Sequence, residues 1–269
     1  MANSSPIGVF DSGVGGLTVV REIMQQIPNE SIIYFGDTAR VPYGNKSPET
    51  IITYSKQIVH FLLSKNVKAI VIACNTASAF TLEALKSEVD IPIIGVVEPG
   101  AFTAAYTTSN NKIGIIATEG TINSQIYPKF LNRLNPQVQV FGKACPLFVP
   151  LVEEGMIDDP ITEEMIKRYT NDLIDKDIDT LILGCTHYPL LKPTIKKVLS
   201  DKISLVNPAY ETAKSLKKVL LDNNIESSTA NNEHAFFVSD GAQKFRQFAN
   251  TILPCKVIEI NNIYNVEQY

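Results

Sequence analysis

Cysteines, long apolar runs and clusters of basic residues are all scarce in this sequence, and each scarcity excludes a class of protein. The 269 residues include four cysteines, Cys74, Cys145, Cys185 and Cys255, which are too few and too widely spaced for a disulfide framework. None of them forms the C-x-x-C pair of a structural zinc site. No apolar run is long enough for a transmembrane helix, and the first residues lack the basic and apolar parts of a signal peptide. We therefore expect a cytoplasmic protein with reduced thiols, no metal and no contact with a membrane.

Charge and composition exclude further classes. The 24 Lys and Arg residues are outnumbered by 28 Asp and Glu residues, and the basic residues form no run that would bind nucleic acid. A hydrophobic fraction of 45% is ordinary for a globular protein and excludes a disordered chain. A chain of this length buries either one large core or two smaller ones.

Short runs rich in Ile, Val and Phe alternate with longer segments of helical period, which is the pattern of a parallel α/β sheet. The predicted strands are 6–10, 31–35, 68–73, 91–96, 112–117, 138–141, 180–184, 203–206 and 235–238. The run 69–73 is apolar throughout, which indicates helices on both faces of the sheet. Ser47 and Asp159 each precede a proline, the pattern of a helix cap. The fold class is therefore doubly wound α/β, and residues 264–269, which show no periodicity, are expected to form a loose tail.

A weak internal repeat divides the chain. Residues 68–76 and 179–187 share one layout, an apolar strand that ends in a cysteine and small polar residues that begin a helix. Their cysteines, Cys74 and Cys185, lie about one compact domain apart in the sequence. We therefore predict two similar lobes with mainly parallel sheets, each contributing one cysteine.

Turn-forming residues mark the crossings between these lobes, at 98–100 and at 207–208. The first lobe is then predicted to comprise residues 1–97 and 208–269. The second lobe is predicted to comprise residues 98–207.

The two repeated cysteines are the strongest candidates for chemistry. Each is expected where a helix begins, and the positive end of a helix dipole stabilises a thiolate and lowers the pKa of the thiol. A single cysteine at a strand end is more often a packing residue, but two in matching contexts favour a reactive pair. Cys145 and Cys255 have no such context, and we interpret both as packing residues.

Other polar residues follow the predicted strands, at the sheet edge where α/β folds bind ligands. The glycine-rich turn at 11–16 matches neither a dinucleotide fingerprint nor a P-loop, so Asp11 is either a helix cap or a group that binds an ammonium or handles protons. His187 lies two residues beyond Cys185, where it would orient the thiol or act as an acid, whereas His60 and His234 have no such context. The residues that are either caps or carboxylate ligands are Asn75, Thr76, Thr118, Thr121 and Thr186.

Four motifs together resemble the glutamate racemases of the aspartate/glutamate racemase family. They are Asp-Ser-Gly-Val-Gly-Gly at 11–16, the segment 36–44, Ala-Cys-Asn-Thr-Ala at 73–77 and Gly-Cys-Thr-His-Tyr-Pro-Leu-Leu at 184–191. The resemblance implies a two-lobed fold with the active site in the cleft between the lobes, and racemisation of glutamate without a cofactor or metal. It also implies a homodimer that supplies D-glutamate for peptidoglycan synthesis.

The resemblance also assigns roles to residues. Cys74 would take the α-proton from D-glutamate and Cys185 from L-glutamate, and Asp11 and His187 would assist the thiols. Two bases on opposite faces of one carbon invert it directly, whereas one base can return the proton to the face it left. The substrate contacts would be Asp11, Ser12, Tyr43, Gly44, Asn75, Thr76, Thr118, Thr121, Thr186 and His187. Asp37 and Glu153 would be further residues that assist the thiols.

Three other functions are compatible with the same residues. An aspartate racemase with paired thiols is the nearest, although such enzymes generally lack the full 11–16 and 185–189 motifs. A cysteine hydrolase would use Cys185 as nucleophile and His187 as base, but it leaves Cys74 without a task. A binding protein that closes on a small ligand without reacting with it is the third.

Overall fold

The chain folds around two parallel β-sheets, which the computed structural model describes for residues 4–199, 201–228 and 233–269. The strands are β1 (Ile7–Asp11), β2 (Ile32–Gly36), β3 (Ala69–Ile72), β4 (Ile93–Gly95), β5 (Lys112–Ala117), β6 (Gln139–Ala144), β7 (Thr180–Gly184), β8 (Ser204–Val206), β9 (Ala235–Val238) and β10 (Asn261–Asn262). The helices are α1 (Leu17–Gln26), α2 (Pro48–Ser64), α3 (Asn75–Lys86), α4 (Val97–Thr107), α5 (Glu119–Asn123), α6 (Ile126–Leu134), α7 (Phe148–Glu153), α8 (Pro160–Ile174), α9 (Lys192–Leu199), α10 (Pro208–Asp222) and α11 (Ala242–Ile252). Short 3-10 helices are η1 (Tyr43–Asn45), η2 (Tyr188–Leu191) and η3 (Val266–Gln268).

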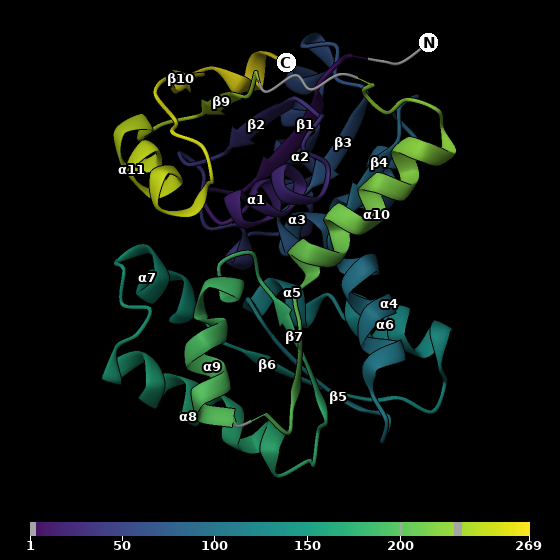
Figure 1. Cartoon of the computed structure of the whole chain (residues 1–269), viewed down its shortest axis with the longest axis vertical. Coiled ribbons are helices and arrows are strands. Elements are labelled where there is room, and N and C mark those ends of the chain that lie inside the picture. Colours follow the sequence, from purple (N-terminus) through teal and green to yellow (C-terminus); the bar gives the residue numbers. More distant parts are fainter. Residues whose placement is uncertain (1–3, 200, 229–232) are drawn as a thin grey trace.

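The two sheets have separate strand orders. The first is β10-β9-β2-β1-β3-β4 and the second is β6-β5-β7-β8, and each pairing in them is parallel. Figure 1 shows them in different halves of the molecule. The predicted doubly wound α/β class with two lobes is confirmed, and all nine predicted strands are present. Among the described residues, no helix is long and apolar enough to span a bilayer.

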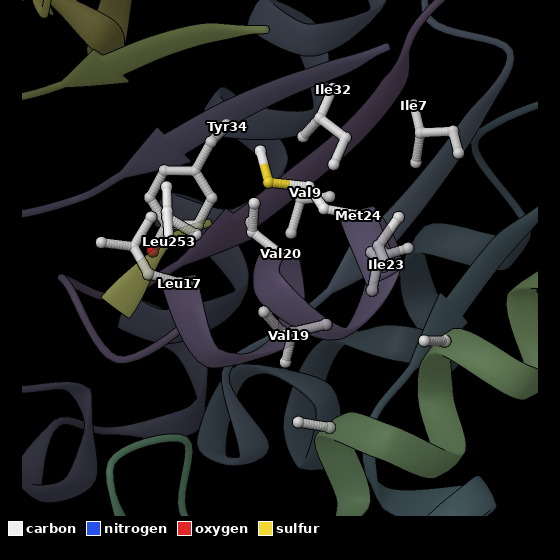
Figure 2. Packing of buried hydrophobic residues seen from close by; sticks show 14 of the residues in the cluster. Ile7, Val9, Leu17, Val19, Val20, Ile23, Met24, Ile32, Tyr34 and Leu253 are labelled. Atoms are coloured by element: carbon white, nitrogen blue, oxygen red, sulfur yellow. The ribbon is translucent and has the colours of Figure 1, made fainter. Parts of the chain in front are cut away.

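Each face of each sheet carries its own apolar cluster. Alternate residues of a strand point to opposite faces, so Val9 and Tyr34 belong to one cluster of the first sheet, and Phe10 and Phe35 to the other. Helices α1, α10 and α11 cover the first of these faces, and Figure 2 shows side chains of α1, such as Val20, beside those of β1 and β2. In the second sheet, α7, α8 and α9 cover one face and α4 and α6 the other.

The chain crosses between the sheets twice, through α4 and α10. The turn predicted at 98–100 is wrong, because these residues belong to the first turn of α4, where a proline is tolerated. Gly100 lies against Pro208 at the start of α10, and a Cβ on Gly100 would come within 2.9 Å of the Pro208 ring. The two connecting helices, α4 and α10, are therefore in contact at this point. The lobe limits given above, 1–97 with 208–269 and 98–207, stay a prediction.

Both predicted helix caps are confirmed. Ser47 and Asp159 each accept a hydrogen bond from a backbone amide in the first turn of their helices, α2 and α8, at 3.3 and 2.8 Å. Each helix also has its proline in the first turn. The sequence signal and the local geometry agree here because a cap depends on neighbouring residues alone.

The expected loose tail at 264–269 is wrong. Val266 is buried at 2% exposure within the cluster under α2. The Tyr269 ring packs edge-on against Phe61 with 5.2 Å between ring centroids, and His60 Nδ1 lies 2.8 Å from the Tyr269 carbonyl oxygen. One buried valine in a polar segment produces no periodicity, so the sequence pattern did not indicate this packing.

A buried serine on α2 gives a test of the packing. Ser55 has no exposed surface, and its hydroxyl has no hydrogen-bond partner within the described chain. An unsatisfied buried hydroxyl costs about 1–3 kcal/mol, and alanine is the better helix former. We expect Ser55→Ala to raise the free energy of unfolding in urea by about 1 kcal/mol. The control is Ser64→Ala, which removes a hydroxyl that donates to the Phe61 carbonyl at 2.7 Å and should not stabilise; a less stable Ser55→Ala would contradict the prediction.

Candidate active site

Cys74 and Cys185 occupy matching places in the two sheets. Cys74 follows β3, which pairs with β1, and Cys185 follows β7, which pairs with β5. Each cysteine is only 6% exposed. The 11–16 loop contacts both cysteine segments, because the Cys74 sulfur donates to the Ser12 hydroxyl and the hydroxyl of Thr186, next to Cys185, donates to Asp11. A helix follows each cysteine, as expected, but the two helices differ in kind and in distance from the thiol. Cys74 caps α3, whereas Cys185 is followed by η2, and α9 begins only at Lys192.

The Cys74 thiol is held by the start of α3 and by the 11–16 loop. Its sulfur accepts a hydrogen bond from the Ala77 amide at 3.5 Å and donates to the Ser12 hydroxyl at 3.6 Å. Burial nevertheless raises the pKa of Cys74 to about 12, and the negative charge of Asp11 adds to the rise. The expected lowering of the thiol pKa is therefore wrong for Cys74, because the loss of water outweighs the helix terminus. The raised pKa favours the protonated thiol, which suits the role of an acid toward L-glutamate.

His187 joins Cys185 to a carboxylate. Its Nδ1 lies 3.8 Å from the Cys185 sulfur, and its Nε2 lies 3.2 Å from Oε1 of Glu153 at the end of α7. Burial opposes the charged ring, but Cys185 and Glu153, aided by Asp11, outweigh it and raise the pKa of His187 to about 10. The hydrogen bond from His187 also lowers the pKa of Glu153, which Lys244 of α11 approaches at 3.8 Å. A positive His187 stabilises negative charge on the neighbouring sulfur.

Asp11 ends β1 and faces the segment that carries Cys185. Its Oδ2 accepts a hydrogen bond from the Gly13 amide at 2.9 Å, and its Oδ1 accepts one from the Thr186 hydroxyl at 3.5 Å. Burial raises the pKa of Asp11, against the opposing effects of a positive His187 and of the Gly13 amide. Gly16 occupies the cap position of α1, and no side-chain cap bond is formed there. Asp11 is therefore not the N-cap residue itself, but its carboxylate also accepts a hydrogen bond from the Gly16 amide at the start of α1. A role in handling protons or binding an ammonium stays a prediction.

Gly15 allows the 11–16 loop to touch the segment 185–187. A Cβ on Gly15 would lie 2.3 Å from Oγ1 of Thr186 and 2.4 Å from Nδ1 of His187. Next to it, Thr18 of α1 donates its hydroxyl to the Thr186 carbonyl at 2.8 Å. These contacts join the two halves of the molecule beside the thiols.

Asp37 follows β2 and supports the next loop. Its carboxylate accepts hydrogen bonds from Arg40 Nε at 2.8 Å, from the Ser239 hydroxyl at 2.9 Å and from the Tyr43 hydroxyl. Burial raises the pKa of Tyr43 well above its ordinary value, and the negative charge of Asp37 adds to the rise. Asp37 was predicted to assist the thiols, but none of these three hydrogen bonds involves a cysteine. Asp37 therefore holds the loop of Tyr43 in place.

Asn75 and Thr76, in the first turn of α3, contact the half of the molecule that contains the second sheet. The Tyr127 hydroxyl of α6 donates to Oδ1 of Asn75 at 2.7 Å. The Thr76 hydroxyl lies 2.9 Å from the hydroxyl of Thr118 and 3.1 Å from that of Thr121. These hydrogen bonds bring the predicted carboxylate ligands of both halves together.

The predicted site residues lie at or beyond the carboxyl ends of five strands, with one exception. Glu153 ends α7 and reaches the site through His187. The others are Asp11 and Ser12 after β1, Asp37, Tyr43 and Gly44 after β2, Cys74, Asn75 and Thr76 after β3, Thr118 and Thr121 after β5, and Cys185, Thr186 and His187 after β7. Gly44 lies close to the other half, since a Cβ on it would be 3.0 Å from Cβ of Thr118. Within the part of the chain that the structure describes, no three His, Cys, Asp or Glu side chains are arranged to hold a metal ion.

Two residues that contact this site were missed from the sequence. Ser239 directly follows β9, so the same strand-end argument applied to that strand would have found it. Tyr127 is the second residue of α6, away from any strand end, and no local signal distinguishes it from a packing tyrosine.

Comparisons with known proteins point to one family. The chain matches the family model described as Asp/Glu/Hydantoin racemase over residues 7–216. A glutamate racemase of Geobacter metallireducens is 48% identical over 261 residues, which cover 97% of this chain and 96% of the relative. The structure of a glutamate racemase isoform from Bacillus anthracis has a TM-score of 0.93 at 43% identity, covering 96% of this chain and 97% of that chain. The structure of glutamate racemase from Francisella tularensis in complex with D-glutamate has a TM-score of 0.92 at 40% identity and covers 99% of each chain.

Proposed function

The chain belongs to the Asp/Glu/hydantoin racemase family and acts on glutamate, and we propose that it interconverts the L and D enantiomers with two thiols as acid and base. The observation that carries this proposal is the pair of buried thiols, Cys74 and Cys185, at matching strand ends of two different sheets. Inversion of a carbon needs a proton acceptor on one face and a proton donor on the other. Thiols from two opposed sheets supply both.

In the proposed reaction with L-glutamate, the Cys185 thiolate takes the α-proton and the Cys74 thiol donates a proton to the opposite face. A positive His187, bonded to Glu153, stabilises the thiolate. The raised pKa of Cys74 keeps that thiol protonated, as this direction requires. The product state has Cys185 protonated and Cys74 ionised, which is the state that reacts with D-glutamate. Proton exchange with solvent, assisted at Cys74 by Asp11, restores the starting state.

The α-proton of an amino acid is weakly acidic, so the site must also stabilise the developing carbanion. Oriented donors in a site with little water supply this stabilisation. Asp11 is suited to the substrate ammonium, since its carboxylate lies close to both cysteine segments. The other proposed substrate contacts are Ser12, Tyr43, Gly44, Asn75, Thr76, Thr118, Thr121, Thr186 and His187.

The cellular role proposed for this activity is the supply of D-glutamate for peptidoglycan. A cytoplasmic location is part of the proposal, because a two-thiol mechanism requires that both cysteines stay reduced. The two thiols carry the proton transfers themselves, so the proposed reaction uses no cofactor. A homodimer is proposed from the family alone.

Circular dichroism of glutamate solutions tests the proposed function. Purified protein without added cofactor should bring L-glutamate and D-glutamate to the same optically inactive mixture. In heavy water the α-hydrogen should be replaced by deuterium at the same time. Activity on aspartate in place of glutamate, or no change in either glutamate enantiomer, would overturn the proposal.

A charge change at Glu153 tests the role of His187. The positive form of His187 is present below its pKa of about 10, so kcat/KM for L-glutamate should fall as the pH rises past that value. Glu153→Gln removes one close negative charge, and we expect the basic limb of the profile to move down by about one to two pH units. The control is Glu154→Gln, an exposed carboxylate whose oxygen lies 3.9 Å from Lys244. The same basic limb in both variants would refute the role.

A further inference from the structure

Asn75 and Tyr127 form a buried hydrogen bond between the two halves of the molecule. Asn75 is the first residue of α3, next to Cys74, whereas Tyr127 belongs to α6 and to an apolar cluster of the second sheet. The two residues are 4% and 1% exposed, and the donor and acceptor oxygens are 2.7 Å apart. One hydrogen bond therefore connects the residue beside a thiol with the helix layer over the other sheet.

This bond decides which end of the Asn75 amide is free. An asparagine side chain has one acceptor oxygen and an amino group with two donor hydrogens. Tyr127 occupies the oxygen, and no described residue accepts a hydrogen bond from Nδ2. Nδ2 is also absent from the fully buried unpartnered atoms of the described chain, so it remains accessible. The accessible end of the amide is therefore its NH2 group, whose hydrogens can bind a carboxylate. Its oxygen faces Tyr127.

The tyrosine is suited to hold this orientation permanently. Burial raises the pKa of Tyr127 far above its ordinary value, and Cys185 adds to the rise, so the hydroxyl keeps its proton. Among the described residues that proton has no other acceptor than the Asn75 oxygen, so turning the amide over would leave a buried donor unpaired. If the amide turned over, its oxygen would face the substrate and repel the carboxylate. A phenylalanine at this position would fill the same space without fixing the amide.

We propose that Tyr127 is a positioning residue for substrate binding, which holds the Asn75 amide with its NH2 group toward a carboxylate of the substrate. This proposal rests on the racemase function proposed above. Tyr127 itself does not contact the substrate in this arrangement. Tyr127 can form this hydrogen bond only when the two halves of the molecule are in contact. The orientation of the Asn75 amide therefore depends on the position of the second sheet.

Steady-state kinetics of Tyr127→Phe test the proposal. The variant should raise KM for both glutamate enantiomers by about fivefold to tenfold, the range of one net hydrogen bond, and leave kcat within about twofold. The matched control is Tyr169→Phe in α8, which removes a half-buried hydroxyl bonded to the Leu147 backbone and should leave KM unchanged. A purely structural role would lower the melting temperature without this split between KM and kcat.

Variants at Asn75 separate the possible outcomes. Asn75→Ala should raise KM at least as much as Tyr127→Phe, and the double variant should be no worse than Asn75→Ala, since the two residues act as one unit. Asn75→Asp keeps the acceptor for Tyr127 but loses the donors, so its KM should rise at least about tenfold. If wild type racemises glutamate but Tyr127→Phe or Asn75→Asp has the wild-type KM, the positioning role is wrong and the proposed function stands. If wild type does not racemise glutamate, the proposed function itself fails.

Discussion

Cys74→Ala and Cys185→Ala are each expected to lower the rate of glutamate racemisation by at least about a thousandfold, measured by circular dichroism from either enantiomer. One positioned acid or base typically contributes 10²–10⁴-fold, and each direction of the proposed reaction needs both thiols. Both cysteines are small and buried, so alanine removes the sulfur with little effect on the backbone. The control is Cys255→Ala, which changes a half-buried packing cysteine and should leave the rate near that of wild type.

Hydrogen exchange distinguishes two separate bases from other causes of inactivity. Cys185→Ala retains Cys74, so in heavy water it should replace the α-hydrogen of D-glutamate by deuterium without changing the optical activity. Cys74→Ala should do the same with L-glutamate. Proton NMR of the α-position follows this exchange for each enantiomer. Racemisation that persists in Cys74→Ala would rule out the two-base mechanism and revive a reaction that depends on Cys185 and His187 alone.

The central strands β1, β3 and β7 were predictable because they are buried on both faces. The run 69–73 is apolar at every position, and such a run has few alternatives to a central strand between two helix layers. The strand β10 was missed because it consists of Asn261 and Asn262, which carry no strand propensity of their own. It exists because β9 offers an unpaired edge for them.

The same logic explains how far the site could be predicted. Parallel strands of one sheet end at a common edge, so Asp11 and Cys74 were expected to lie close together. Cys185 belongs to the other sheet, and only the family resemblance implied that it faces them across a cleft. The pKa of Cys74 was not predictable, since it depends on how completely the folded chain buries the thiol and on the charge of Asp11 beside it. Tyr127 was missed because its hydrogen bond to Asn75 joins residues of the two halves that are far apart in the sequence, and no spacing in the sequence encodes it.

Gly15→Ala should lower kcat/KM for glutamate by about a hundredfold while the protein stays folded. The new Cβ would lie 2.3 Å from Oγ1 of Thr186 and 2.4 Å from Nδ1 of His187, so these two side chains or the whole segment must move. A displacement of about 1 Å in a catalytic constellation can cost about a hundredfold in rate. The backbone of Gly15 does not have a positive φ, so alanine is not strained at this position for any other reason.

The matched control for this substitution is Gly142→Ala on β6. Its Cβ would lie 3.2 Å from Cδ1 of Ile122, the flexible end of a side chain far from the thiols in the sequence. Both variants add one methyl group and restrict the unfolded chain equally, so their melting temperatures provide the comparison for stability. We expect Gly142→Ala to keep the wild-type kcat/KM. Wild-type activity in Gly15→Ala would mean that Thr186 and His187 can move without loss, and that the close contact between the 11–16 loop and the segment 185–187 is not required for catalysis.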